Sequence, residues 1–113
     1  MSFNVFSTPP FERQLKRLAK KYPSLKVEFA TLLDQLESQP DLGTPIGNNC
    51  YKIRISIASK GKGKRGGGRI VTHIMISESV VFLLAIYDKS EKASLTDAEL
   101  KELLGSISKE PTR

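Results

Sequence analysis

Three basic residues in the middle of the chain have the types and spacing of a phosphate-binding site. Lys52 and Arg54 alternate with isoleucines, and Arg69 follows a glycine-rich segment at 61–68. A period of two is typical of a half-buried strand, in which alternate side chains share one face. If the strands on both sides of the glycine-rich segment pair as a hairpin, Lys52, Arg54 and Arg69 project from one exposed face. The same alternation places His73 on that face.

Such a cluster favours phosphodiester chemistry on RNA without a metal ion or another cofactor. Arginine and lysine can hold a phosphate and stabilise its developing charge, and a lysine crowded by cations more readily becomes the neutral base. A metal-dependent nuclease needs clustered carboxylates, whereas Asp88 and Glu91 are the only acids nearby. Without a metal ion to activate water, the most readily available nucleophile is the 2′-hydroxyl of the RNA substrate itself. The residues therefore favour RNA over DNA as the substrate.

The positive charge of the chain is concentrated around this cluster. The formal net charge is +6, from 18 Lys and Arg against 12 Asp and Glu. No acidic residue lies between Tyr51 and Arg69, so the remainder of the chain is close to neutral. Such a local excess attracts a polyanion. We expect the glycine-rich loop to bind RNA through four of its cations, although a merely solvated loop explains them about as well: Lys60, Lys62, Lys64 and Arg65.

Two other reactive residue types occur only once each. His73 is a candidate general acid or base, although a lone histidine in a strand is more often structural. Cys50 has no partner for a disulfide within the chain and is expected to be a small packing residue rather than a nucleophile. One cysteine and one histidine cannot form a zinc site. A reducing, cytoplasmic setting is the expectation, with no membrane contact.

The surrounding pattern predicts one α+β domain that covers residues 1–113. The expected order is strand, two helices, three strands and a short terminal helix that begins with the capping box Thr96 to Glu99. A polar tail follows from about residue 106. The expected core positions on the central strands are isoleucines: Ile53, Ile55, Ile70, Ile74 and Ile76. The chain is long enough for one core but not for two.

The order of elements and three short segments resemble the RelE/ParE superfamily of toxin proteins from Phe11 to about Leu104. The segments are Cys50-Tyr51-Lys52-Ile53-Arg54, Gly68-Arg69-Ile70-Val71 and Tyr87-Asp88-Lys89-Ser90-Glu91-Lys92. The long loop and the last segment are most similar to the HigB-like branch. The resemblance implies a small RelE-like fold, in which two N-terminal helices pack on one face of an antiparallel sheet and a short C-terminal helix follows.

The resemblance also implies a function. It suggests the toxin of a type II toxin-antitoxin system, an endoribonuclease that cuts mRNA in the ribosomal A site, inhibits translation and is held inactive by a cognate antitoxin, with which it can form an oligomer. A basic trio on the middle strands catalyses the reaction in RelE-type toxins, and the matching residues are Lys52, Arg54 and Arg69. RelE also uses an arginine at the end of its last strand and a C-terminal tyrosine that stacks on a base. Lys89 and Tyr87 are the candidates for these roles.

Two other functions fit the same residues. ParE-type members of the superfamily inhibit DNA gyrase and are not nucleases, so the fold alone does not determine the activity. A basic module that binds RNA or the ribosome without catalysis would need the charge but not the geometry of the cluster. Retention of Lys52, Arg54 and Arg69 favours the nuclease.

Overall fold

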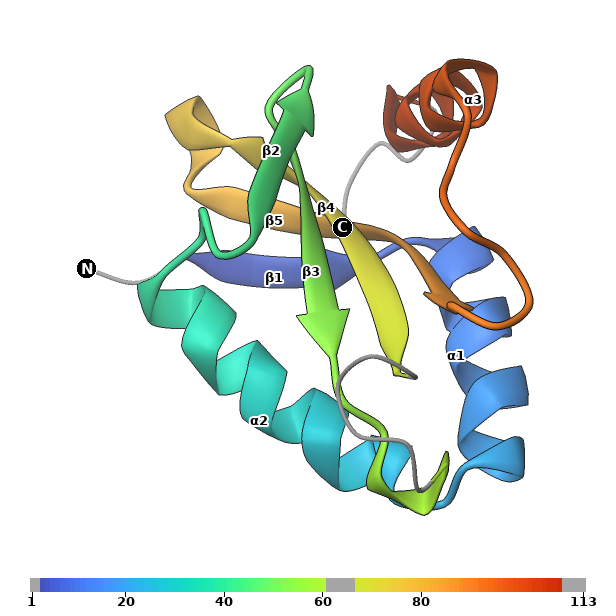
Figure 1. Cartoon of the computed structure of the whole chain (residues 1–113). Coiled ribbons are helices and arrows are strands. Elements are labelled where there is room, and N and C mark those ends of the chain that lie inside the picture. Colours follow the sequence, from blue (N-terminus) through green and yellow to red (C-terminus); the bar gives the residue numbers. More distant parts are fainter. Residues whose placement is uncertain (1–2, 61–66, 109–113) are drawn as a thin grey trace.

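The computed structural model describes residues 3–60 and 67–108, apart from the side chains of Lys60 and Ser108. It has an α+β fold, as the sequence predicts (Figure 1). In chain order, the elements are β1 (Asn4–Ser7), α1 (Pro9–Lys21), α2 (Leu25–Ser38), β2 (Thr44–Gly47), β3 (Cys50–Ile55), η1 (Ala58–Lys60), β4 (Gly68–Met75), η3 (Ile76–Glu78), β5 (Val80–Asp88) and α3 (Asp97–Ser108).

The five strands form one sheet in the order β1-β5-β4-β3-β2. Pairs β5-β4, β4-β3 and β3-β2 are antiparallel, but β1 is parallel to β5. The prediction of an antiparallel sheet is therefore wrong for β1, because the chain passes from this strand into two helices rather than into a hairpin. Strand β2 was not predicted. Its sequence, Thr44 to Gly47, includes a proline, which an edge strand tolerates.

Helices α1 and α2 cover one face of the sheet. α1 begins with two prolines, which suit the first turn of a helix, and buries Phe11 and Leu18. α2 buries Leu25, Leu32 and Leu36 against the same core. None of the helices in the described part of the chain is long and apolar enough to cross a membrane.

Helix α3 packs on the opposite face of the sheet (Figure 1). The predicted capping box is confirmed, because the Glu99 amide donates to Thr96 Oγ1 at 3.1 Å and the Thr96 amide donates to Glu99 Oε1 at 2.9 Å. The helix continues to Ser108, with Ile107 partly buried, so the predicted polar tail at 106–113 begins inside the helix. Residues 109–113 lie outside the described residues.

The predicted isoleucine core is confirmed with one exception. Ile53, Ile55, Ile70 and Ile74 are buried, each with 5% or less of its surface exposed. Ile76 is 71% exposed, which contradicts the prediction. The strand ends at Met75, and Ile76 begins the short helix η3, so the alternation of faces no longer applies to it.

A buried carboxylate joins the end of β5 to the end of α1. Asp88 is fully buried, and its Oδ2 accepts a hydrogen bond from the Tyr22 hydroxyl at 2.8 Å. Its Oδ1 accepts from the amide and the hydroxyl of Ser90, at 3.0 and 2.8 Å. These bonds compensate for the loss of hydration that burial imposes on the charge. They fix the end of the central sheet to the helical layer.

We expect the Tyr22→Phe variant to be less stable by about 1–3 kcal/mol, because it removes a donor from a buried carboxylate. Urea denaturation of the purified protein measures this change. The matched control is Tyr51→Phe, because the Tyr51 hydroxyl makes no hydrogen bond to any residue that the structure describes. Equal stabilities of the two variants would contradict the anchoring role of Asp88.

Candidate functional site

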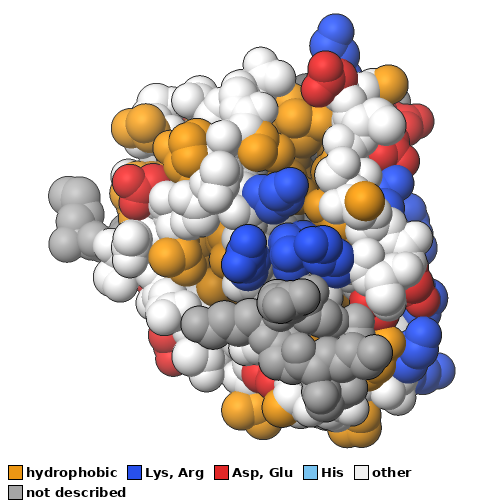
Figure 2. All heavy atoms as spheres, viewed as in Figure 1, with side chains coloured by type: hydrophobic (Ala, Val, Ile, Leu, Met, Phe, Trp, Pro, Cys, Tyr) orange, Lys and Arg blue, Asp and Glu red, His pale blue; other side chains and the backbone are white. Residues whose placement is uncertain are grey.

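The pairing of β3 with β4 brings three cations together on one face of the sheet. Arg54 lies directly opposite Arg69, and Lys52 lies opposite Val71, two positions further along both strands. Residues directly opposite each other share a face, with their Cβ atoms about 5 Å apart. We call Lys52, Arg54 and Arg69 the basic cluster. Figure 2 shows Lys and Arg side chains gathered at the centre of this face, with hydrophobic side chains beside them.

The three cations differ in their exposure to solvent. Arg54 is exposed and Lys52 is partly buried, whereas only 6% of the Arg69 surface is accessible. The Arg69 guanidinium donates through Nη1 to the carbonyl of Gly68 at 2.9 Å. The expectation that all three cations project from an exposed face is therefore wrong for Arg69, because this residue lies on a central strand between β3 and β5.

Tyr87 extends the row of the two arginines onto β5. It lies directly opposite Arg69 in the register of β4 and β5 and is 6% exposed. Its hydroxyl is buried and has no hydrogen-bond partner among the described residues. Burial raises the pKa of the phenol, and the charges of Arg69 and Lys92 partly oppose that change. Tyr87 is thus a neutral aromatic side chain beside the basic cluster.

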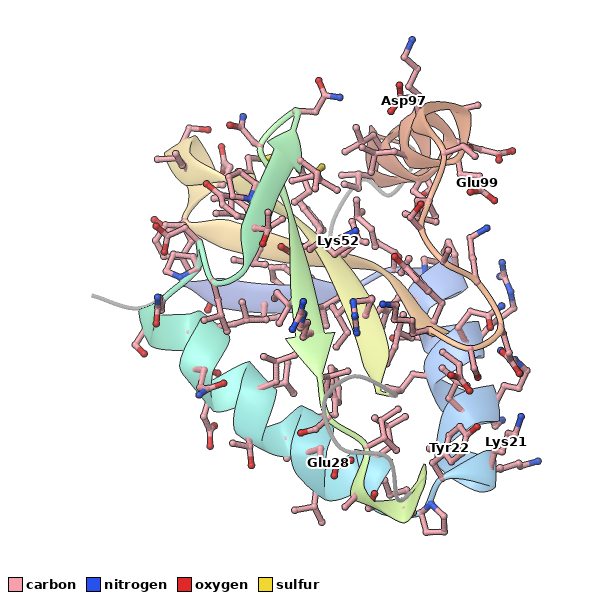
Figure 3. All side chains as sticks on the ribbon, in the orientation of Figure 1. Lys21, Tyr22, Glu28, Lys52, Asp97 and Glu99 are labelled. Carbon is pink, nitrogen blue, oxygen red and sulfur yellow. The ribbon has the colours of Figure 1, made fainter. Side chains whose placement is uncertain are left out.

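The loop between β3 and β4 is fixed at both of its ends. Before it, the Ala58 amide donates to Glu28 Oε2 at 2.6 Å, and the Ser59 amide donates to Ser24 Oγ at 2.9 Å. Glu28 lies near the start of α2, close to this segment in Figure 3. After the loop, the Lys89 amide donates to the Gly67 carbonyl at 3.2 Å.

The predicted RNA-binding residues of the loop fall mostly outside the described residues. This applies to Lys62, Lys64 and Arg65. The backbone of Lys60 belongs to η1, but its side chain is not described. Lys89 is exposed and follows the end of β5, next to Gly67 at the end of the loop.

His73 shares a sheet face with the basic cluster but is separated from it. It lies opposite Cys50, four positions from Arg69 along β4, which corresponds to about 13 Å. Its Nδ1 lies 3.0 Å from the Asn48 carbonyl, to which it can only donate, and 3.6 Å from Cys50 Sγ. Burial lowers the pKa of the imidazole. Through these contacts, His73 supports the turn between β2 and β3.

Cys50 has the environment of a packing residue. It is buried, with 1% of its surface exposed, and contacts the cluster of apolar residues under α3. Burial raises the pKa of the thiol to about 11. At neutral pH the thiol is therefore protonated, whereas a nucleophilic cysteine needs the thiolate.

Two structural supports of the site had only weak signals in the sequence. Asp88 stands out in the sequence only as a nearby acid and as part of the segment Tyr87 to Lys92, and neither signal indicates that it anchors β5. Gly67 passes so close to β3 that a Cβ atom there would lie 2.2 Å from the Ile55 carbonyl oxygen. The run of glycines at 66–68 was the available signal for this close approach. In the described part of the chain, no three His, Cys, Asp or Glu residues are grouped so that they could hold a metal ion.

Comparison with known proteins supports the fold. No protein-family model matches the sequence. Among solved structures, the chain is similar to a mutant of the E. coli toxin RelE in the free state, with a TM-score of 0.61 and 16% sequence identity. The match covers 99% of this chain and 100% of the RelE chain. The RelE-like fold predicted from the sequence is thus confirmed, whereas the HigB-like branch stays a prediction.

The unequal burial of the two arginines predicts unequal effects on stability. We expect Arg69→Ala to lower the free energy of unfolding by about 1–3 kcal/mol, because it removes a buried side chain and its hydrogen bond to the Gly68 carbonyl. Arg54→Ala, at the exposed partner, should change the free energy of unfolding by no more than about 0.5 kcal/mol. Urea denaturation of both variants is the measurement. An Arg69→Ala variant as stable as the wild type would contradict the buried position of this side chain.

The lowered pKa of His73 predicts a loss of stability in mild acid. The unfolded chain, with a histidine of ordinary pKa near 6.5, binds a proton more readily than the folded protein, so stability falls as pH drops below that value. Because the chain has one histidine, His73→Gln should flatten the change in melting temperature between about pH 7.5 and 5.5. Parallel curves for wild type and variant would contradict this origin.

Proposed function

We propose that this protein is the toxin of a type II toxin-antitoxin system and belongs to the RelE/HigB-like branch of the RelE/ParE superfamily. In this proposal it is a metal-independent endoribonuclease that cuts mRNA in the ribosomal A site and thereby inhibits translation. The observation that carries the proposal is the basic cluster, in which Arg54 and Arg69 are paired across two strands and Lys52 lies two positions away. The RelE-like fold supports it.

The chemistry of the cluster suits transfer of a phosphoryl group within the RNA strand. The two arginines stay protonated at any working pH and can bind two phosphate oxygens each, so Arg54 and Arg69 are assigned to the scissile phosphate. Lys52, in its neutral form, accepts the proton of the adjacent 2′-hydroxyl. The 2′-oxygen then bonds to phosphorus while the bond to the 5′-oxygen breaks. The leaving 5′-oxygen takes up a proton, so the products are a 2′,3′-cyclic phosphate and a 5′-hydroxyl.

Burial of Arg69 favours this division of roles. A guanidinium held by the Gly68 carbonyl is oriented before the substrate binds, and a fixed donor loses little entropy when charge develops on the phosphate. Lys52 is more accessible and has a flexible stem, which a group that moves a proton needs. Figure 3 shows Lys52 over the middle of the sheet, between β2 and α3.

The neighbouring cations are assigned to the RNA strand on both sides of the cluster. We assign Lys60, Lys62, Lys64 and Arg65 of the loop to backbone phosphates. Lys89 lies beside the end of this loop and is assigned to a further backbone phosphate. The ring of Tyr87 is the candidate for stacking on a base. His73 is a weaker candidate for catalysis, because it lies at the far end of the face.

A protein partner is also part of the proposal. A cognate antitoxin with an acidic segment would complement the basic cluster and neutralise the toxin by covering it. Toxin and antitoxin would then form a complex in the cytoplasm, with the mRNA and the ribosome as the competing partners of the free toxin.

The test is cleavage of mRNA by the purified protein in the presence of translating ribosomes, with the cut ends mapped. Lys52→Ala and Arg69→Ala should each lower the cleavage rate by roughly 10²-fold or more, as loss of one transition-state donor does elsewhere. Lys52→Ala should also abolish the rise of the rate with pH, because it removes the base, whereas Arg69→Ala should retain it. Lys26→Ala, which changes an exposed lysine on α2, is the matched control.

Three results would overturn parts of this proposal. Cleavage at near wild-type rates by Lys52→Ala and Arg69→Ala would exclude the basic cluster as the active site. Inhibition of DNA gyrase without any mRNA cleavage would favour the ParE-like alternative. Binding to ribosomes without cleavage would favour a non-catalytic module.

A further inference from the structure

Side chains of α2 hold the part of the chain that leaves β3 toward the glycine-rich loop. Ile57 is buried in the core, but Ala58 and Ser59, which follow it in η1, are exposed. Packing therefore fixes the chain only as far as Ile57. Beyond it, the Ala58 amide is held by Glu28 and the Ser59 amide by Ser24. We call Ser24, Glu28, Ala58 and Ser59 the loop anchor (Figure 3 shows Glu28).

The hydrogen bonds of the loop anchor form one network. A carboxylate only accepts, so the Ser24 hydroxyl donates to Glu28 Oε1 at 3.1 Å. The Ser59 hydroxyl then donates to Ser24 Oγ, which is 2.7 Å away, because the proton of the Ser24 hydroxyl is already engaged. Ser59 Oγ in turn accepts from the Ser24 amide at 3.2 Å. The network ends at Glu28, whose second oxygen accepts from the Ala58 amide at 2.6 Å.

Glu28 is an acid beside a basic surface, but it does not neutralise that surface. Together with Arg54, it lines a cavity of about 260 Å³ between α2 and β3. Both of its oxygens accept from uncharged donors, the Ser24 hydroxyl and the Ala58 amide. Arg54 forms no ion pair with any residue that the structure describes. The guanidinium therefore stays available to a phosphate while the carboxylate holds the backbone.

The next residues along the chain carry the cations that are assigned to backbone phosphates. Lys60 directly follows Ser59, and the other cations of the loop come shortly after it. A binding group on a fixed backbone loses less conformational freedom when it meets its ligand than a group on a free segment. Because the loop anchor fixes Ala58 and Ser59, it lowers this entropic cost for the cations that follow, and most of all for Lys60.

We propose that Glu28 is a positioning residue for RNA, which fixes the start of the loop so that its cations meet the backbone phosphates. Removal of an acid normally strengthens binding to a polyanion, because the net positive charge increases. Removal of this acid together with its hydrogen bonds weakens binding instead. The inference rests on the proposed function for the assignment of the loop cations to RNA, but binding alone tests it, without any cleavage.

The first experiment compares Glu28→Ala with Glu28→Gln, which remove the same charge at the same position. In Glu28→Gln the amide oxygen can accept from Ala58 and the amide nitrogen can donate to Ser24 Oγ, so the loop anchor is retained. Glu28→Ala loses both contacts but keeps a residue that favours helix. The exposed Glu37 of α2 makes no side-chain hydrogen bond or ion pair with the described residues, so Glu37→Ala is a further control.

The probe is a short single-stranded oligonucleotide with 2′-O-methyl groups, which the proposed reaction cannot cut because the 2′-oxygen is blocked. Fluorescence anisotropy gives its Kd at several salt concentrations. For Glu28→Ala we expect a Kd about 5-fold higher in about 0.1 M salt and a salt slope smaller by about 0.7, which corresponds to one lost phosphate contact. Glu28→Gln and Glu37→Ala should bind as tightly as the wild type or more tightly. If Glu28→Ala binds as tightly as Glu28→Gln, the positioning role is wrong.

Two further measurements keep the test independent of any effect of Glu28→Ala on folding. Ser59→Ala changes an exposed residue and should raise the Kd about 2- to 3-fold, whereas Ser59→Thr retains the hydroxyl and should bind as the wild type does. Ser56→Ala, at an exposed serine outside the loop anchor, is the control. Hydrogen exchange of the Ala58 amide, followed by NMR, should be at least about 5-fold faster in Glu28→Ala than in Glu28→Gln. Equal exchange rates would contradict the anchor.

Cleavage of mRNA on ribosomes separates this inference from the proposed function. Glu28→Ala should raise KM about 5-fold and leave kcat within about 2-fold of the wild type, because the basic cluster is unchanged. Cleavage that depends on the basic cluster, with equal Kd values for Glu28→Ala and Glu28→Gln, would overturn the positioning role and leave the nuclease intact. Weaker binding by Glu28→Ala alone, in a protein that cuts no mRNA, would overturn the nuclease and leave the positioning role.

Discussion

The pairing of β3 with β4 is the constraint on which the whole site depends. It sets Arg54 directly opposite Arg69, although like charges in such a position repel each other and destabilise a sheet. The register must therefore be held by other residues. Ile53 and Ile70, which are also paired, face the core formed with α1 and α2 and are 4% and 0% exposed. A slip by one residue would move these isoleucines to the other face, and their burial outweighs the repulsion of the two arginines.

The face of the sheet opposite α1 and α2 has two parts. One part packs against α3, and the other carries the basic cluster. Leu100 of α3 packs with Val71, Leu84 and Cys50, so this part of the face is closed by the helix. Lys and Arg side chains gather at the centre of the face shown in Figure 2, and Lys52 lies over the middle of the sheet in Figure 3, between β2 and α3. Because apolar side chains flank the cations, water screens their charges less than on an open surface. The position of α3 thus decides which part of this face is covered by the helix.

Much of this arrangement could be predicted from local patterns in the sequence. The alternation at 51–57 gave the strand and its two faces, and the spacing of Thr96 and Glu99 gave the start of α3, because both signals depend only on neighbouring residues. The parallel position of β1, the extra strand β2 and the burial of Arg69 depend on contacts between distant parts of the chain. Exposure of Ile76 shows the limit of a periodic pattern, since alternation does not reveal where the strand ends.

The end of β5 links the helical layer to the basic cluster through two successive residues. Side chains alternate along a strand, so Asp88 lies on the side of Tyr22 while Tyr87 lies on the side of Arg69. Gly68 pairs with Asp88, and its carbonyl accepts a hydrogen bond from the Arg69 guanidinium. The two strands are so close here that a Cβ atom on Gly68 would lie only 2.9 Å from the Tyr87 carbonyl oxygen. A continuous series of contacts therefore runs from the hydroxyl of Tyr22 to the guanidinium of Arg69. The carboxylate that anchors β5 and the carbonyl that holds the Arg69 guanidinium thus belong to residues paired across two strands, so the helical layer supports the strand end beside the arginine that is assigned to the phosphate.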